Sequence, residues 1–258
     1  MSTTKLDWYE NHYVAWLELT RPEAKNSISL EMLRSLRGKI REVKDSKARV
    51  LLITGSGDSF SAGADLKERK TMSDLQVKEF LSGITQCFLE IENLSIPTIA
   101  VINGFAFGGG LELALSCDIR YASESASMGL TETKLGIIPG AGGTQRLSRL
   151  VGKATAMEWI FSGKKIGANL AKDKGLVSDI FPVENLKESC LATAREISDS
   201  APIAVKAAKR AIKEGLEMSL AASLLWERLC YMDTLGTKDR LEALDAFAQK
   251  RKPNFKGE

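Results

Sequence analysis

The chain has 258 residues, of which 44% are hydrophobic and 27% charged, a composition that excludes a disordered chain and a coiled coil. Its 36 basic and 33 acidic residues leave a net charge of +3, which is too small to require a nucleic-acid partner but suits an anionic ligand. The length allows one large domain, or a domain with a smaller appendage.

The spacing of the cysteines and the N-terminal residues indicate the cellular compartment in which the protein is expected. The four cysteines are far apart and form no C-x-x-C pair, which predicts reduced thiols and neither a disulfide framework nor a zinc site. The N-terminus shows no apolar signal-peptide core and no arginine-rich presequence, so we expect a cytoplasmic protein or the mature form of an organellar one. The uncharged run from Leu94 to Leu111 is interrupted by Pro97 and several glycines, which favours a buried strand and a loop over a membrane helix.

The first predicted elements alternate between strand and helix. Residues 13–19 form an apolar run that predicts a strand, and an amphipathic helix is expected after Ser29, a suitable N-cap. Residues 49–54 predict a strand buried on both faces, and another helix is expected within residues 70–93. Four apolar residues at helical spacing in that helix are interpreted as core, with an acyl-pocket lining as the alternative: Phe80, Ile84, Phe88 and Ile91.

The only histidine, His12, stands at the start of the first predicted strand, with no carboxylate or glycine motif beside it. This position argues against Ser-His-Asp chemistry, and the scattered cysteines offer no metal cluster. Carboxylates are therefore the natural proton carriers in this chain.

A glycine-rich stretch from Asn103 to Asp118 is the most informative part of the chain. It follows an apolar run, residues 99–102, and leads into a helical pattern, so that three consecutive glycines stand where a strand passes to a helix N-terminus. Glycines allow the main chain to approach a ligand, and the free N–H groups of a first helical turn favour developing negative charge. This pattern predicts an oxyanion hole, with Glu112 within a turn of its donors.

A second carboxylate, Glu132, lies among apolar and glycine neighbours between Ala126 and Arg146. Desolvation there would raise its pKa toward the range in which an acid passes protons at neutral pH. The alternative is equally open at this point: Glu112 as a surface helix residue and Glu132 as a loop salt bridge.

The second half of the chain changes from mixed to helical. Strand and helix alternate as far as Pro182, which implies helices covering a mostly parallel sheet. Beyond residue 185 only helices are expected, over residues 201–214, 217–235 and 237–250, with Asp239 complementing the dipole of the last. Their large apolar content suggests partner subunits.

Three segments in this order resemble the enoyl-CoA hydratase/isomerase, or crotonase, superfamily: Phe60–Lys67, Asn103–Asp118 and Gly136–Arg146. The likeness covers essentially the whole chain. The run after Lys25 and the ending after Thr237 are most similar to the methylglutaconyl-CoA hydratase branch, whose mammalian member also binds AU-rich RNA.

The resemblance implies an α/β crotonase fold, with a spiral of ββα units in residues 1–195 and a helical trimerisation segment in residues 196–258. It implies a homotrimer or a dimer of trimers, outside the membrane, acting on acyl-CoA. The implied reaction is reversible syn hydration of a 2-enoyl-CoA thioester to 3-hydroxyacyl-CoA, with 3-methylglutaconyl-CoA as a candidate. The thioester is the substrate, and no metal or redox cofactor is expected.

The resemblance also assigns site residues. The amides of Ala64 and Gly109 would hold the thioester oxygen, Glu112 would deprotonate water, and Glu132 would protonate C2. CoA would contact a further set: Ala24, Lys25, Ala62, Asp65, Leu66, Lys67, Gly140, Phe247 and Lys250, the last two often reaching a neighbouring subunit.

Two other functions remain open at this stage. The Δ3,Δ2-enoyl-CoA isomerase branch shares the fold but typically manages with one acid, so the presence of both glutamates favours the hydratase. RNA binding would require the basic face of the first predicted helix, with Arg34, Arg37 and Arg41. There Leu30 and Gly38 stand where the RNA-binding relative is expected to have lysines, which makes nucleic acid an unfavoured partner.

Overall fold

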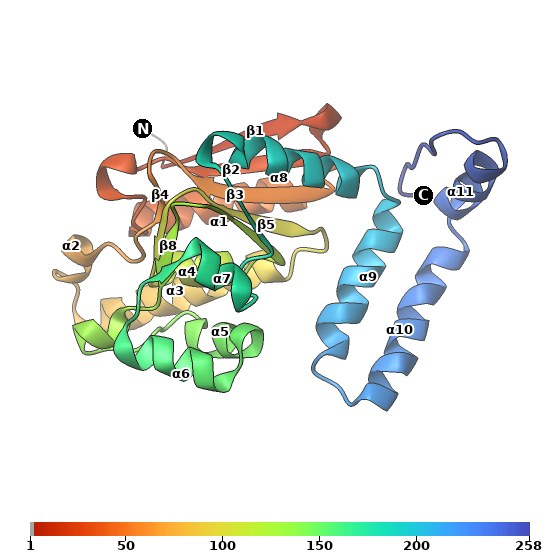
Figure 1. The fold of residues 1–258 in the computed structure, drawn as a ribbon. Coiled ribbons are helices and arrows are strands. Elements are labelled where there is room, and N and C mark those ends of the chain that lie inside the picture. Colours follow the sequence, from red (N-terminus) through yellow and green to blue (C-terminus); the bar gives the residue numbers. More distant parts are fainter. Residues whose placement is uncertain (1–2) are drawn as a thin grey trace.

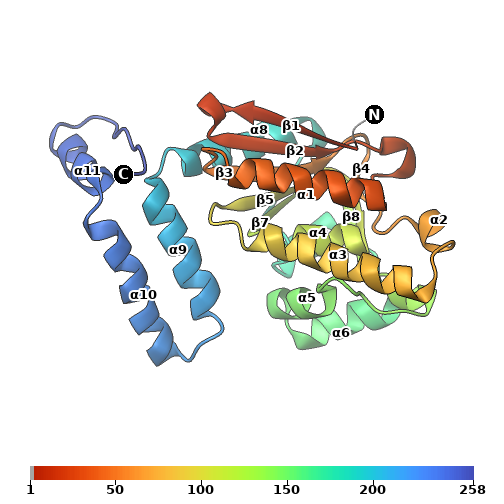
Figure 2. The same ribbon diagram turned by 180° about the vertical axis from the view of Figure 1, so that it is seen from behind.

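The computed structural model describes residues 3–258, which fold into two sheets, a helical coat and a helical arm (Figures 1 and 2). The larger sheet has six strands in the order β1-β2-β3-β5-β7-β10, antiparallel between β1 and β2 and parallel from β2 onward. Its strands are β1 (Thr4–Tyr9), β2 (Val14–Leu19), β3 (Val50–Gly55), β5 (Thr98–Ile102), β7 (Ile119–Ser123) and β10 (Asp179–Phe181).

The smaller sheet has four strands in the order β4-β6-β8-β9, and its first three are parallel. Each of these three follows a strand of the larger sheet along the chain, and helices come after it, which gives a repeated ββα unit. The predicted α/β crotonase spiral is confirmed. The strands are β4 (Ser59–Ser61), β6 (Phe105–Phe107), β8 (Ser127–Gly129) and β9 (Ile166–Gly167).

Helices cover both faces of the larger sheet. On one face α1 and α3 bury their apolar sides against alternate strand residues such as Leu17 and Ile53. On the other face α8 packs on Trp16, Leu52 and Val101. Full burial of each such aliphatic or aromatic side chain contributes about 1.5–3 kcal/mol, so the sheet holds the core together. The core helices are α1 (Leu30–Lys44), α2 (Leu66–Arg69), α3 (Asp74–Glu92), α4 (Gly109–Leu115), α5 (Gly143–Val151), α6 (Lys153–Ser162), α7 (Ala168–Asp173) and α8 (Val183–Ser198), with short 3-10 helices η1 (Glu10–His12), η2 (Pro22–Ala24) and η3 (Glu132–Leu135).

Most predicted elements are present within two or three residues of their expected ends. Ser29 caps α1 as expected, its side chain accepting from the Met32 amide at 3.1 Å. The uncharged run that begins at Leu94 forms β5, β6 and the start of α4, and no helix in residues 3–258 has the length and apolarity to cross a membrane. All four cysteines are buried free thiols.

Strand β1 was not predicted, since the first strand was expected at residue 13. It is an edge strand that pairs only with β2, and most of its side chains are half-buried. An edge strand of this kind lacks a clear apolar alternation, which is why its sequence carries a weak signal.

The C-terminal arm stands beside the core (Figures 1 and 2) and consists of α9 (Pro202–Gly215), α10 (Leu220–Leu235) and α11 (Lys238–Ala248). The expected boundary between residues 195 and 196 falls inside α8, three residues before its end at Ser198. Helix α10 packs against α9, and among its residues only Cys230 is buried. The division into two domains stays a prediction.

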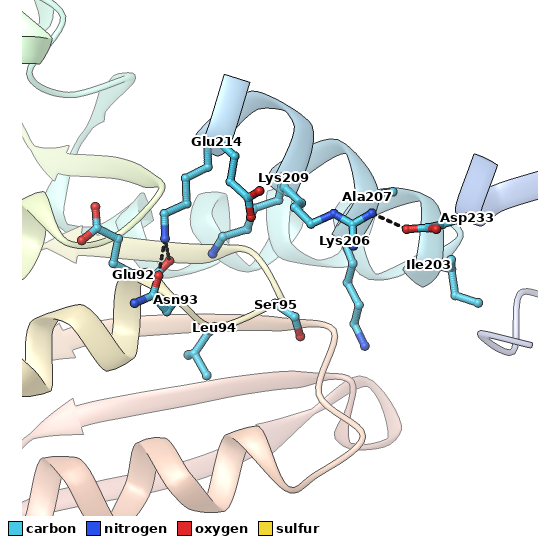
Figure 3. A pocket seen from close by; sticks show the side chains of 12 residues that line it. Glu92, Asn93, Leu94, Ser95, Ile203, Lys206, Ala207, Lys209, Glu214 and Asp233 are labelled. Atoms are coloured by element: carbon cyan, nitrogen blue, oxygen red, sulfur yellow. Dashed lines mark hydrogen bonds and ion pairs between the residues drawn. The ribbon is translucent and has the colours of Figure 1, made fainter. Parts of the chain in front are cut away.

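Lysines of α9 attach the arm to the core. The Lys209 ammonium donates to the Asp118 carboxylate at 2.6 Å and to the Ile96 carbonyl at 2.9 Å, and Lys213 donates to Asn93. A cavity of 380 Å³ lies between α9 and the segment around Asn93 (Figure 3). Its basic side chains are mostly paired with core or arm acceptors, which marks it as a structural junction.

Candidate active site

The glycine-rich segments that are far apart in the sequence meet around a cavity of 580 Å³. Its walls come from the chain before and within α2, from α3, from the start of α4 and from η3 with the loop that follows. The lining residues are Ala62, Gly63, Ala64, Leu66, Arg69, Val77, Phe80, Leu81, Ile84, Gly108, Gly109, Glu112, Thr131, Glu132, Leu135, Ile137, Ile138, Gly140 and Ala141.

The amides of Ala64 and Gly109 lie side by side at one end of this cavity. A Cβ placed on Gly109 would be 3.5 Å from the Ala64 nitrogen, which sets the two backbones in contact. Neither amide donates to an acceptor within residues 3–258. The Gly109 amide also belongs to the first turn of α4, where N–H groups have no intrahelical partner. Two unsatisfied donors that face the same space form an anion-stabilising pair.

Close packing between α4 and β4 creates this geometry. A Cβ on Gly110 would lie 2.1 Å from the Ser61 carbonyl oxygen, so only glycine permits the approach. The approach brings the N-terminus of α4 beside the chain that leaves β4 toward Ala64.

Glu112 is buried in the first turn of α4, with 3% of its surface exposed. Its Oε1 accepts the amides of Ala141 and Gly143, both at 2.8 Å. Burial raises the pKa of Glu112, while these two donors and, more weakly, the Arg146 charge oppose the rise. The carboxylate is thus held in a fixed orientation by main-chain groups.

Glu132 begins η3 and is 9% exposed. Its Oε2 has no hydrogen-bond partner within the described residues. Burial is the main cause that raises the pKa of Glu132 to about 7; the nearby Glu112 charge contributes to the rise, and a hydrogen bond from the Glu132 backbone opposes it. Both acids are therefore buried on one cavity, which rules out the alternative of a surface helix residue and a loop salt bridge.

The other residues assigned to CoA fall into separate groups. Ala62, Leu66 and Gly140 line the cavity, whereas Ala24 lies in η2 outside its walls and Lys67 is exposed on α2. The residues assigned to CoA thus extend from the cavity to α2 and η2.

Two polar members of that set have structural partners. Asp65 caps α2 by accepting the amides of Lys67 and Glu68, and it pairs with Arg21 at 3.2 Å. Lys25 pairs with Asp58 at 2.5 Å. Asp65 is therefore engaged in holding the loop, while the exposed Lys25 pair can exchange partners at little cost.

Phe247 and Lys250 are not brought to the cavity within one chain. Phe247 lies on α11, where it is 87% exposed, and Lys250 follows that helix. Helix α11 lies on the side of the molecule away from α2 (Figure 1).

The structure also places residues considered for other roles. Phe80, Ile84, Phe88 and Ile91 are all buried in the core, as predicted, and the first two of them also line the cavity. His12 is exposed and contacts Trp8, with ring centroids 5.5 Å apart. Arg37 is engaged with Glu90 at 2.5 Å, which weakens the basic face that RNA binding would need.

Two features of the site were missed in the sequence. The amides that orient Glu112 come from Ala141 and Gly143. Their glycine-rich segment was predicted to belong to the site, but its sequence did not show that its amides bind the Glu112 carboxylate. Arg69 lines the cavity. The sequence could not show this, because the tertiary fold decides which side of a short helix faces a cavity. The only available signal was that Arg69 is a basic residue two positions after the Phe60–Lys67 segment.

A ββα spiral in which a helix N-terminus and a strand-end amide face two buried acids defines a protein of the crotonase fold class. Residues 9–258 match the family described as Enoyl-CoA hydratase/isomerase. The chain belongs to this family.

Named relatives and solved structures agree with that assignment. The chain is 49% identical over 243 residues to "Probable enoyl-CoA hydratase 2, mitochondrial" of Arabidopsis thaliana, covering 93% of this chain and 81% of that protein. It is 46% identical over 255 residues to the human "Methylglutaconyl-CoA hydratase, mitochondrial", covering 96% of this chain and 75% of that one. The crystal structure of an enoyl-CoA hydratase from Bacillus anthracis superposes with a TM-score of 0.97 at 46% identity, covering 99% and 100% of the two chains.

Proposed function

We propose that this chain is an enoyl-CoA hydratase, a hydro-lyase that adds water reversibly across the C2–C3 double bond of a 2-enoyl-CoA thioester. One observation carries the proposal: two buried acids with different hydrogen-bond environments share a cavity with a pair of unsatisfied amides. The family assignment and the names of the relatives support the same chemistry.

In this proposal the amides of Ala64 and Gly109 hold the thioester oxygen. Addition of hydroxide at C3 moves electron density through the double bond onto that oxygen, which acquires enolate character. Preorganised donors stabilise such charge by about 3–4 kcal/mol each at comparable sites. The same donors bind the uncharged substrate carbonyl more weakly, so they favour the transition state.

The acids divide the proton transfers between them. Glu112, held by two N–H donors that favour its charged form, takes a proton from the water that attacks C3. Glu132, whose pKa is raised to about 7, gives its proton to C2 on the same face. The proton taken by Glu112 then passes to Glu132, so each cycle adds the elements of one water to the thioester and restores both acids. No resident metal or redox cofactor takes part.

The finer properties are also part of the proposal. The relatives named methylglutaconyl-CoA hydratase make 3-methylglutaconyl-CoA a candidate substrate beside simpler enoyl thioesters. The exposed apolar arm supports assembly into a homotrimer or a dimer of trimers. A cytoplasmic or organellar location stays a prediction, since the relatives include proteins named as mitochondrial and bacterial ones.

The test is hydration of crotonyl-CoA by the Glu112→Gln and Glu132→Gln variants. Each is expected to lower kcat by at least about a hundredfold, a typical contribution of a positioned proton carrier. Glu79→Gln is the matched control, because Glu79 is exposed on α3 and has no hydrogen-bond or ion-pair partner among residues 3–258. Near-normal turnover in both site variants would remove the proposal, and faster conversion of a 3-enoyl-CoA than of a 2-enoyl-CoA would favour the isomerase.

A further inference from the structure

Arg69 is the one basic residue among those that line the site cavity in the described part of the chain. The remaining lining is mostly apolar, and the only other charged members are the two glutamates. A cation in such a wall is unfavourable beside a purely hydrocarbon acyl group. The cation would lose hydration and gain no hydrogen-bond or charge partner in return.

The guanidinium of Arg69 has no hydrogen-bond or ion-pair partner within residues 3–258, although its side chain is half-buried. Other partly buried arginines are engaged: Arg21 pairs with Asp65, Arg37 with Glu90 and Arg146 with Glu92. Arg69 therefore offers its donors to something that enters the cavity.

Helix α2 is fixed in place, so that Arg69 is presented by a defined backbone. The Asp65 cap holds the first turn, the Arg69 amide donates to the Asp65 carbonyl at 2.9 Å, and Glu68 accepts the Leu30 amide at 3.0 Å. A guanidinium on such a support binds a carboxylate through two parallel N–H donors, a geometry that a lysine cannot reproduce.

We propose that Arg69 binds a free carboxylate at the far end of the acyl group, so that the site selects 2-enoyl-CoA thioesters of dicarboxylic acids. The inference rests on the proposed hydratase function. The acyl chain runs from the Ala64 and Gly109 amides along the apolar wall from α3, and Arg69 meets its anionic end. Arg69 is a substrate-binding residue and takes no part in proton transfer.

The test compares two probes of equal carbon number, glutaconyl-CoA, which ends in a carboxylate, and 2-pentenoyl-CoA, which ends in a methyl group. The wild-type protein should have the higher kcat/KM for glutaconyl-CoA. The ratio of the two kcat/KM values should fall about 10- to 100-fold in Arg69→Met, the range for losing a charge-assisted hydrogen-bond pair. Arg69→Lys should give an intermediate ratio. Lys70→Met is the matched control, because Lys70 is exposed at the end of the same helix and is absent from the cavity wall.

Each alternative has a distinct outcome. An equal loss for both probes in Arg69→Met would show that the guanidinium binds the CoA phosphates and would overturn the inference, as would an unchanged ratio. Absence of hydration of both probes and of crotonyl-CoA by the wild-type protein would instead remove the proposed function itself.

Discussion

Glu112 and Glu132 occupy the same cavity but differ in what their oxygens contact. Two amides at 2.8 Å favour the charged form of Glu112, whereas Glu132 Oε2 has no donor within the described residues and is desolvated. A charge on Glu112 also disfavours a second charge nearby, so the two acids titrate as a coupled pair. The different donors around the two acids thus favour a charged Glu112 beside a neutral Glu132, which places a base next to an acid.

The raised pKa of Glu132 makes stability depend on pH. The ordinary value is 4.5 and the folded value is about 7, so the folded protein binds more protons than the unfolded chain between these limits. The free energy of unfolding therefore falls as the pH rises through this window, and the full penalty is present above pH 7. Glu132→Gln removes the charge, so the variant should be more stable than wild type at pH 8, by on the order of 3 kcal/mol, with little gain at pH 4.

Urea unfolding of both proteins at pH 4 and pH 8 measures this difference. Glu79→Gln, at an exposed position on α3, should show the same small effect at both pH values. A Glu132→Gln variant that is less stable than wild type at pH 8 would contradict the assignment of a neutral, desolvated acid.

At the scale of elements, local patterns predicted most helices and strands. The N-cap of α1 and the glycine run before α4 are encoded by neighbouring residues, so the sequence located them. Both glutamates were found for the same reason, because each lies within a glycine-rich segment. The edge strand β1 has half-buried side chains and carries no such pattern.

Long-range contacts explain what could not be predicted. Asp65 belongs to a motif associated with CoA, but its carboxylate pairs with Arg21 from a different part of the chain and caps α2. Asp239 lies in the first turn of α11, as expected for a residue that complements the dipole, yet it also accepts the amides of Lys256 and Gly257 and holds the C-terminal tail. Arg69 faces the cavity only because of how α2 is anchored. Such roles depend on tertiary geometry.

The attachment of α9 to the core is an element-scale feature that can be tested. Lys209 donates to Asp118 and Ile96, and Asp118 also accepts the Thr98 amide and hydroxyl. Lys209→Met leaves the carboxylate and the carbonyl without this donor, both in partly buried surroundings. The free energy of unfolding should fall by about 1–3 kcal/mol, and amide exchange in α9 should become faster.

Lys206→Met is the control for this experiment, because Lys206 lines the cavity between α9 and the core (Figure 3) but is exposed and has no hydrogen-bond or ion-pair partner in the described part of the chain. Its effect should stay within about 0.5 kcal/mol. Equal effects of the two substitutions would mean that the Lys209 contacts add nothing to docking of the arm.

At the scale of the whole molecule, the arm exposes more apolar surface than a monomer usually does. On α10, Leu225 is 66% exposed and Leu229 is 59% exposed, and further leucines and a tyrosine of that helix also face solvent. Many exposed apolar side chains on a helix that packs mainly against α9 are typical of a subunit interface. Phe247 of α11 and Lys250 beyond it do not reach the cavity of their own chain, so their predicted contact with CoA requires assembly that brings α11 to another copy's cavity.

Light scattering should therefore give a mass three or six times that of the 28.2 kDa chain. Replacing Leu225 and Leu229 together by Asp places two charges in the buried interface and should yield the monomer, because an unpaired buried charge costs several kcal/mol. Leu75→Asp, at an equally exposed leucine of α3, should leave the mass unchanged.

If α11 of one copy completes the CoA site of another, the monomeric variant should also show a raised KM for crotonyl-CoA while its acids keep their raised pKa values. A wild-type protein that is monomeric at micromolar concentration would mean that the apolar face of α10 has a different partner, and that the cavity of a single chain must bind CoA without Phe247.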